Sequence, residues 1–327
     1  MASELYGAID LGGTSVRAIV ADLGGNICGD DIRPSQAEVG LENCLAAMQA
    51  SLQAAADEAG LPIASLRAVG IDSPGPVDVL RGVVPWAPQL HGWRDVPLVK
   101  EMSARFGVPV VLENDANAQA LGEHTFGAGR GTQHMLFVTV STGIGGGIIV
   151  DGRLYRGANG SAGELGHVML DPRGPLCGCG ARGCLEALAS GTALARRGDE
   201  AAERNPGGRL AQARERDGRI TADEVAAAAE EGDVEAREIF REAGHWLGTA
   251  FAGYVNIFNP QAIVVGGGVT RAAHLFLPEA ESTMRSLAMS EPLKHVKLVI
   301  GELWDRAGVL GMIAWMRSAP PDAAPEQ

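Results

Sequence analysis

Two segments of the chain have the same plan: a strand, a glycine-rich turn and a second strand. The first is LYGAIDLGGTSVRAIVADLGGNI at residues 5–27, and the second is HMLFVTVSTGIGGGIIVDGRLY at residues 134–155, about 130 residues later. Apolar runs on both sides of a Gly-rich turn are typical of β-hairpins. Because similar units recur at half-chain spacing, the sequence predicts a duplicated α/β domain with a cleft between the halves. Hairpins are common, so the repeat alone is weak evidence.

Helices and further strands are expected between and after these hairpins. Leu41, Leu45, Met48 and Leu52 recur at helical spacing and predict an amphipathic helix over 41–59, which Gly60 and Pro62 end. From residue 187 the chain should be helical. The expected caps there are Thr221 with Glu224 as a capping box, and Asp233. Further strands are expected within 66–78, 108–115, 262–269 and 296–303, and a closing helix within 307–317.

The acidic composition argues against several classes of function. The formal net charge is −13, which makes nucleic acid or an anionic membrane surface a poor partner. No stretch approaches the roughly 20 apolar residues of a membrane span. The N-terminus has neither a basic flank nor an apolar signal core, so we expect a cytoplasmic protein with reduced thiols.

Three Gly-rich turns follow apolar strands and are candidates for phosphate binding. Backbone amides in such turns can approach an anion without an intervening side chain. Asp10, before the first turn, could hold Mg²⁺ through water. For any single loop an ordinary tight hairpin is the simpler interpretation, but three together favour a nucleotide. Neither a P-loop nor a dinucleotide fingerprint fits, and the G-x-G-x-x-G at 178–183 lacks the required strand-to-helix context. The candidate residues are Asp10, Gly12, Gly13, Thr14, Thr142, Gly143, Gly266, Gly267 and Gly268.

Three of the five cysteines fall within eight residues. Cys177, Cys179 and Cys184 follow His167 and together offer the ligand set of a closed, tetrahedral structural zinc site. The alternative is a group of unrelated reduced cysteines, which their crowding disfavours. An iron–sulfur cluster would need a further ligand. Cys28 and Cys44 lie elsewhere and are expected to be single thiols.

The segment ENDANAQA at 113–120 places Glu113, Asn114 and Asp115 where a buried strand gives way to a helix. From the residues alone, Asn114 or Asp115 is expected to cap that helix. A carboxylate at this point can also accept a proton from a substrate hydroxyl. The residues by themselves leave both interpretations open.

Read together, DLGGTSVR, ENDANAQALGE, VSTGIGGG, GELGH and CGCGARGCLE closely resemble the ROK family of sugar kinases and repressors, from about residue 5 to about 317. The resemblance implies the actin-like, ribonuclease-H-like ATPase fold, two α/β domains around a cleft. We expect a small domain of residues 1–112 plus about 305–318 and a large domain of 113–304 that contains the zinc loop 167–184. Residues 319–327 are expected to be a disordered tail.

The resemblance also implies roles for particular residues. Asp115 resembles the general base, and the zinc ion held by His167 and the cysteines would shape the sugar-binding loop rather than act in catalysis. Family kinases often read Pro-Asn-Leu where this chain has Gln89, so the substitution puts the identity of the sugar in doubt. The positions implied to contact the sugar are Gly75, Gln89, Asn114, Asp115, Glu164, His167 and Glu186.

The sequence therefore predicts an ATP-dependent, Mg²⁺-requiring hexose kinase that makes glucose 6-phosphate. One alternative is a kinase of fructose, mannose or an N-acetylhexosamine. A second is a sugar-responsive repressor, which the early first phosphate loop and the acidic charge disfavour. A third is a sugar-binding protein without catalysis, against which Asp10 and Asp115 argue. No nucleic-acid or membrane partner is expected, and a homodimer or homotetramer would be ordinary for the family.

Overall fold

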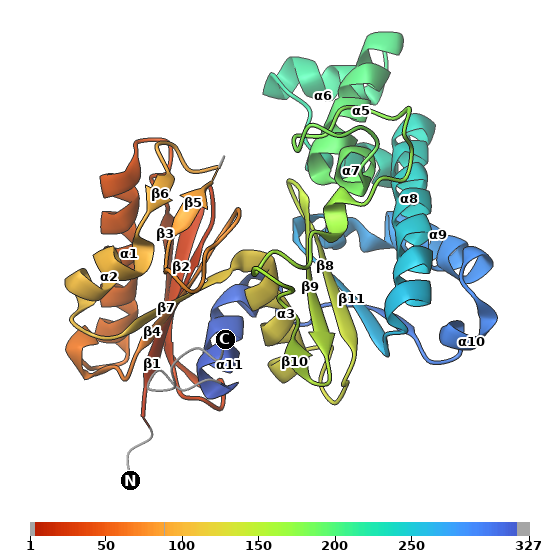
Figure 1. Cartoon of the computed structure of the whole chain (residues 1–327). Coiled ribbons are helices and arrows are strands. Elements are labelled where there is room, and N and C mark those ends of the chain that lie inside the picture. The colour runs from red at the N-terminus through yellow and green to blue at the C-terminus, as the bar shows by residue number, and fades with distance from the viewer. Residues whose placement is uncertain (1–3, 88, 319–327) are drawn as a thin grey trace. The chain divides into compact units, whose positions relative to one another are not determined.

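The computed structural model describes residues 4–87 and 89–318 (Figure 1). Its contacts divide the chain into two compact units. The first comprises residues 1–131, 147–163 and 302–327, and the second comprises 132–146 and 164–301. The domain boundaries expected at 112/113 and about 305 remain a prediction. The expected disordered tail, 319–327, lies outside the described residues.

The first unit is built on a five-stranded sheet in the order β3-β2-β1-β4-β7. The pairs β1–β2 and β2–β3 are antiparallel, whereas β4 lies parallel to both β1 and β7. A separate hairpin is formed by β5 (Val84–Trp86) and β6 (Arg94–Val96). The strands of the main sheet are β1 (Tyr6–Leu11), β2 (Ser15–Ala21), β3 (Ile27–Pro34), β4 (Val69–Ser73) and β7 (Val110–Asn114).

Helices cover both faces of this sheet (Figure 1). On one face lie α1 (Leu41–Glu58) and α2 (Leu98–Phe106), and on the other lies α11 (Ala307–Ser318), which also packs on α3 (Asp115–Phe126). Ile9 and Leu11 belong to the core beneath α1, whereas Tyr6 and Ala8 pack with α11. Because side chains alternate along a strand, Asp10 lies on the α11 face.

The second sheet has the order β10-β9-β8-β11-β12, with β11 parallel to both β8 and β12. The strand order corresponds to that of the first sheet, and β8, β11 and β12 are parallel as β1, β4 and β7 are, which confirms the duplicated α/β plan predicted from the two hairpins. Its strands are β8 (Met135–Val140), β9 (Ile144–Val150), β10 (Arg153–Leu154), β11 (Ala262–Gly266) and β12 (Lys297–Ile300).

Helices make up most of the second unit, as expected from residue 187 onwards. The two predicted caps are confirmed: the Thr221 backbone N–H donates to Glu224 Oε2 at 2.8 Å, and Asp233 Oδ1 accepts from the Ala236 N–H at 3.0 Å. The α-helices are α4 (Leu185–Ala189), α5 (Gly191–Arg204), α6 (Arg209–Asp217), α7 (Ala222–Glu230), α8 (Val234–Phe258), α9 (Ala273–Leu287) and α10 (Ser290–Leu293). Short 3₁₀ segments are η1 (Ile63–Ser65), η2 (Leu165–His167), η3 (Gly268–Ala272) and η4 (Trp304–Arg306).

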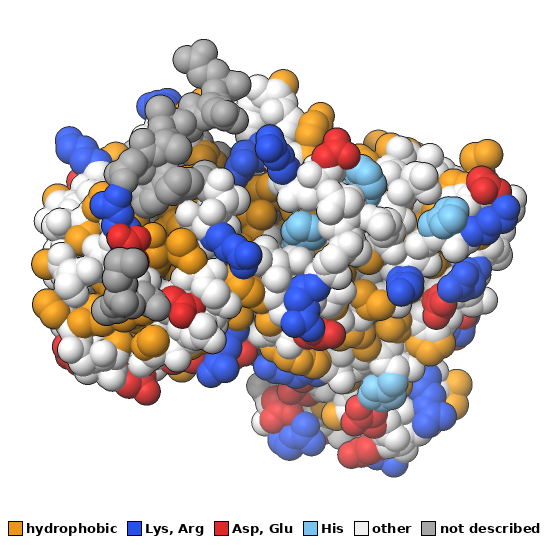
Figure 2. Space-filling model, turned by 90° about the horizontal axis from the view of Figure 1, so that it is seen from below, with side chains coloured by type: hydrophobic (Ala, Val, Ile, Leu, Met, Phe, Trp, Pro, Cys, Tyr) orange, Lys and Arg blue, Asp and Glu red, His pale blue; other side chains and the backbone are white. Residues whose placement is uncertain are grey.

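Among the helices of the described residues, none is both long and apolar enough to cross a membrane. On the coloured part of the face in Figure 2, Lys and Arg side chains are interspersed with Asp and Glu rather than gathered into one basic patch.

Candidate active site

A row of carboxylates crosses the first sheet at the carboxyl ends of its parallel strands. Asp10 of β1 is paired in register with Asp72 of β4, and Asp72 is paired with Glu113 of β7. In open α/β sheets this edge of the parallel strands is where ligands bind. Three acidic side chains that are far apart in the sequence therefore lie together at the edge of the sheet where ligands bind in this type of fold.

Glu113 is the neutralised member of the row. Its side chain is 1% exposed and forms an ion pair with Arg156 at 2.7 Å. Asn117 Nδ2 donates to the other carboxylate oxygen at 3.1 Å, and the Asn114 N–H donates to the same oxygen at 3.0 Å. An ion pair and hydrogen bonds of this kind offset the cost of burying a charged carboxylate. Glu113 thus serves to fix the end of β7 rather than to react.

Asn114 and Asp115 differ in what their side chains bind at the start of α3. Asn114 is the N-cap of α3, because its Oδ1 accepts from the Ala116 and Asn117 N–H groups at 3.0 and 3.2 Å. Its Nδ2 donates to the Gly75 carbonyl at 3.1 Å and to Asp115 Oδ1 at 3.0 Å. The cap is therefore supplied by Asn114, and Asp115 begins the helix with its side chain available for another purpose.

Asp115 is held by one oxygen only. Oδ1 accepts from the Ala116 N–H at 2.8 Å as well as from Asn114, whereas Oδ2 accepts no hydrogen bond from the described residues. Burial raises the pKa of this carboxyl to about 7, with a further contribution from the negative charge of Asp10, against the opposing effect of the Ala116 N–H. A carboxylate that is oriented by one oxygen and titrates near neutral pH is suited to accept a proton.

The first glycine turn lies at the end of β1, beside the carboxylate row. The Gly12 N–H donates to the Ser15 carbonyl at 2.9 Å, and Ser35 donates to the Gly13 carbonyl at 3.0 Å. Gln89 packs on this turn, since a Cβ at Gly13 would lie 3.3 Å from the Gln89 Cβ. Thr14, at the tip, is exposed.

Gly75 needs to be glycine. Its φ is +83°, and a Cβ there would lie 2.7 Å from the Trp86 carbonyl oxygen. The Gly75 carbonyl in turn receives the amide of Asn114. The loop after β4 is therefore tied to the start of α3, so Gly75, Asn114 and Asp115 form one structural group in the first unit.

The second glycine turn joins β8 to β9 in the second unit. The Gly191 N–H donates to the Ser141 carbonyl at 2.7 Å, and the Thr192 hydroxyl donates to the Thr142 carbonyl at 2.8 Å. The Ile144 N–H donates to Glu186 Oε2 at 3.1 Å. The beginnings of α4 and α5 thus hold the backbone of this turn in a fixed conformation.

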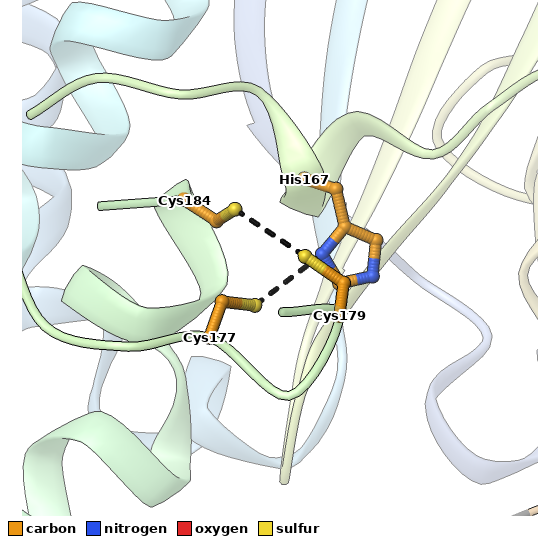
Figure 3. A group of neighbouring side chains, drawn as sticks. All are labelled: His167, Cys177, Cys179 and Cys184. Atoms are coloured by element: carbon orange, nitrogen blue, oxygen red, sulfur yellow. Dashed lines mark hydrogen bonds between the residues drawn. The ribbon is translucent and has the colours of Figure 1, made fainter. Parts of the chain in front are cut away.

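The four predicted zinc ligands come together (Figure 3). One ligand atom from each of His167, Cys177, Cys179 and Cys184 lies within 4.8 Å of the others. His167 Nδ1 is 3.6 Å from Cys177 Sγ, and Cys179 Sγ is 3.7 Å from Cys184 Sγ. Cys177 and Cys184 are buried, and burial raises the pKa of the Cys177 thiol to about 12. Three sulfurs and one imidazole nitrogen at these separations fit a tetrahedral zinc ion.

Glu186 connects this cluster to the second glycine turn. Its Oε1 lies 3.6 Å from Cys177 Sγ, while its Oε2 accepts the Ile144 N–H. A Cβ at Gly143 would lie 2.5 Å from Glu186 Oε2, so a larger residue there would require the Glu186 carboxylate to move away from the Ile144 N–H. Glu164 Oε2 lies 3.8 Å from His167 Nε2. Glu164 and Glu186 therefore lie beside the cluster to which His167 belongs, and the sugar contacts that the resemblance implies for these three residues remain a prediction.

A pocket of about 160 Å³ opens beside the third glycine turn in the second unit. Gly267 has a φ of +89°, and a Cβ there would lie 2.4 Å from the Val140 carbonyl oxygen, so only glycine fits between the ends of β8 and β11. Gly268 lines the pocket together with residues of α7, α8 and η3, namely Ala222, Asp223, Ala226, Ala227, Glu230, Phe240, Val269, Arg271 and Ala272.

Sequence reasoning missed three residues of the carboxylate row and its surroundings: Asp72, Arg156 and Gly308. Asp72 could have been noticed as an acidic residue inside the otherwise apolar strand AVGIDS. Arg156 follows the second hairpin and pairs with Glu113 only through the tertiary fold. Gly308, in the first turn of α11, faces Asp10 and Asp72, and no local pattern marks it.

Comparisons with known proteins agree with these arrangements. A sequence model of the ROK family matches residues 6–319. The chain is 36% identical over 303 residues to the glucokinase of Thermotoga maritima, covering 93% of this chain and 94% of that protein. It is 31% identical over 310 residues to the xylose repressor of Caldicellulosiruptor bescii, covering 95% of this chain and 77% of the repressor.

A solved structure gives the same result. The crystal structure of a ROK family glucokinase from Streptomyces griseus in complex with glucose and AMPPNP superposes with a TM-score of 0.83 at 36% identity, covering 96% of this chain and 100% of that chain. ROK sugar kinases have the actin-like ATPase fold, so the predicted fold class is confirmed. On its sequence and its structure, the chain belongs to the ROK family.

Proposed function

We propose that the chain phosphorylates a hexose at its 6-hydroxyl with ATP as donor, and that glucose is the preferred sugar. The observation that carries the proposal is Asp115, whose Oδ2 accepts no hydrogen bond from residues 4–87 and 89–318, while burial raises its pKa to about 7. Phosphoryl transfer to an alcohol needs such a group to accept the hydroxyl proton. The nearly full-length similarity to bacterial glucokinases supports the choice of reaction.

Each glycine turn has a part in this proposal. The turns at Gly12 to Thr14 and at Thr142 and Gly143 would hold the phosphates through backbone amides. The pocket beside Gly266 to Gly268 would take the adenosine. Asp10 would hold Mg²⁺, which when bound supplies charge neutralisation for the phosphate oxygens. The fixed backbone around both hairpins supports this, since donors that are already in place need not reorganise.

The sugar would be bound by side chains that each unit orients separately. In the first unit these are Gly75, Gln89 and Asn114 with the base Asp115, and in the second Glu164, His167 and Glu186. Zinc held by His167 and the three cysteines would order the loop that carries the second set, which supports a structural role for the metal. We expect the sugar site to close when the sugar binds. Closure would exclude water, which would otherwise compete with the sugar hydroxyl as acceptor of the phosphoryl group.

Gln89 leaves the choice of sugar open to experiment. It packs on Gly13 of the first phosphate turn, and its amide is one methylene longer than the Asn often found at this position in family kinases. Fructose, mannose and N-acetylhexosamines are the competing substrates. We further propose that the protein is cytoplasmic and forms a homodimer or homotetramer, and that it acts on small molecules without nucleic acid or membrane partners.

The test is a coupled assay of ADP release with Mg-ATP against glucose, mannose, fructose, N-acetylglucosamine and N-acetylmannosamine. We expect glucose to give the highest kcat/KM. If another sugar gives the highest value, Gln89→Asn is the first variant to examine, because it restores the shorter amide. The absence of ADP release with every sugar in zinc-loaded protein would contradict the proposed kinase activity.

A further inference from the structure

Asp72 is a fully buried member of the carboxylate row whose oxygens no described residue satisfies. It is 0% exposed, and neither carboxylate oxygen has a hydrogen-bond partner among the described residues. A buried ionised carboxylate without a partner is costly, and native proteins normally pair it or place it on a metal. Glu113, its neighbour in the same row, shows the usual solution with Arg156 and Asn117.

The basic side chains around the row do not compensate Asp72. Arg17, in register with Asp10 on β2, forms ion pairs with Asp30 at 2.8 Å and Asp305 at 2.6 Å. Arg156 pairs with Glu113. The negative charges of Asp10 and Asp115 lie close enough to disfavour ionisation of Asp72 further. The charge of the Asp10–Asp72 pair is therefore left to be balanced either by a proton that the two carboxyls share or by a cation from outside the chain.

Gly308 lets the first turn of α11 approach the two carboxylates closely. A Cβ at this position would lie 3.0 Å from Asp10 Oδ2 and 3.0 Å from Asp72 Oδ2. Both oxygens thus lie on the same side of the α11 backbone at Gly308, and a methyl group there would crowd the two of them. Gly308 lies in the first turn of α11, where alanine would be the better helix former, so helix stability does not explain the glycine.

We propose that Asp10 and Asp72 together hold a divalent cation, with both carboxylates as ligands, before any nucleotide binds. Its identification as the Mg²⁺ of the phosphoryl transfer rests on the proposed function. Magnesium in kinase sites is typically held by one or two carboxylates plus phosphate oxygens and retains several waters. Asp72 would fix the cation from the buried side of the row, and Asp10 from the side of the first phosphate turn.

The direct test is titration of the zinc-loaded, full-length protein with Mn²⁺ alone, followed by the electron paramagnetic resonance signal of free Mn²⁺. Mn²⁺ shares the preference of Mg²⁺ for oxygen ligands. Asp72→Asn should lower the Mn²⁺ affinity by about 10- to 100-fold. Asp305→Asn is the matched control, because it removes a negative charge that acts on Asp10 without removing a carboxylate from the pair. Its Mn²⁺ affinity should change by less than about 3-fold, as expected for an exposed charge screened by solvent.

Gly308→Ala tests the close approach of α11 rather than the charge. The methyl group would lie about 3.0 Å from Asp10 Oδ2 and Asp72 Oδ2 and force the two carboxylates to move, so Mn²⁺ affinity should fall although all acidic residues remain. Without added divalent cation, the Tm of Asp72→Asn should equal or exceed that of wild type, because the variant removes an unpaired buried charge. Added Mn²⁺ should raise the Tm of wild type and not that of Asp72→Asn.

Unchanged Mn²⁺ affinity in Asp72→Asn would overturn the proposal, and the pair would then be satisfied by a shared proton. An equal loss in Asp72→Asn and Asp305→Asn would also overturn it, since the effect would be one of general charge. Mn²⁺ binding is measured without turnover, so these outcomes do not depend on the kinase activity. Wild type that binds Mn²⁺ through Asp72 but phosphorylates no sugar would refute the proposed function and leave the cation site in place.

Discussion

The carboxylate row of the first unit and the His/Cys cluster of the second are built in opposite ways. The cluster comes from one short segment, with Cys177, Cys179 and Cys184 on a single loop and His167 ten residues before it. The row comes from β1, β4 and β7, whose acidic residues meet only when the strands pair in register. Local spacing thus predicts the first kind of site, while only the sheet reveals the second.

The two sites also offer different chemistry. Thiolates and imidazole select a softer ion such as zinc, while carboxylates select a hard ion such as Mg²⁺. Zinc would stabilise a loop with little regular structure, whereas the row lies on a five-stranded sheet held by its own strand pairing. We therefore expect loss of the metal to affect folding at the cluster and ligand binding at the row.

The largest effect should come from breaking the cluster. Structural zinc can contribute on the order of 10 kcal/mol to ordering its segment, so Cys184→Ser should lose the bound zinc and markedly lower Tm. Cys28→Ser is the matched control, because Cys28 is exposed and outside the cluster. Zinc content by elemental analysis and Tm by calorimetry give the result. A Cys184→Ser protein with one zinc per chain and an unchanged Tm would refute the site.

Asp115→Asn should show the opposite behaviour, a large loss of rate without loss of fold. A positioned base contributes about 10²- to 10⁴-fold, so kcat should fall by that factor. The amide can still occupy the place of the carboxylate, and Tm should change little. Steady-state kinetics and calorimetry on the same preparation check both parts. Near-normal kcat in the variant would remove Asp115 from the role of base.

Arg156→Ala tests whether the buried charge of Glu113 in the carboxylate row depends on its ion pair. The variant leaves Glu113 buried without its cation, and we expect the free energy of unfolding to fall by about 1–3 kcal/mol. Arg196→Ala is a suitable control, since its ion pair with Glu200 is exposed and should contribute less than about 1 kcal/mol. Urea denaturation measures both. Equal effects would mean that Glu113 is not dependent on Arg156.

The smallest expected effect is a pH dependence of the rate. Because the pKa of Asp115 is raised to about 7, its protonated form predominates below that pH and cannot accept a proton. The value of kcat/KM should therefore fall as pH decreases through about 7, by about tenfold for each further pH unit, and level off above it. A profile with its midpoint near 4, the ordinary value for an aspartic acid, would contradict the assignment.

The sequence predicted the parts of the molecule that depend on neighbouring residues. Both hairpins, the helix beginning at Leu41, the capping box at Thr221 and the cysteine loop follow from local spacing and are found as expected. The lack of a hydrogen-bond partner for Asp72 among the described residues depends on the strand register, which places it between Asp10 and Glu113. The close approach of Gly308 to Asp10 and Asp72 depends on how α11 packs on the sheet. No short stretch of sequence predicts either feature, because both depend on contacts between distant segments.

The most direct test of the proposed function is formation of glucose 6-phosphate from glucose and Mg-ATP, followed as NADPH with glucose 6-phosphate dehydrogenase. Wild type should produce NADPH only when both glucose and ATP are present, and Asp115→Asn should produce it at least about 10²-fold more slowly. Absence of NADPH with correctly folded, zinc-loaded wild type, or an equal rate with Asp115→Asn, would contradict the account.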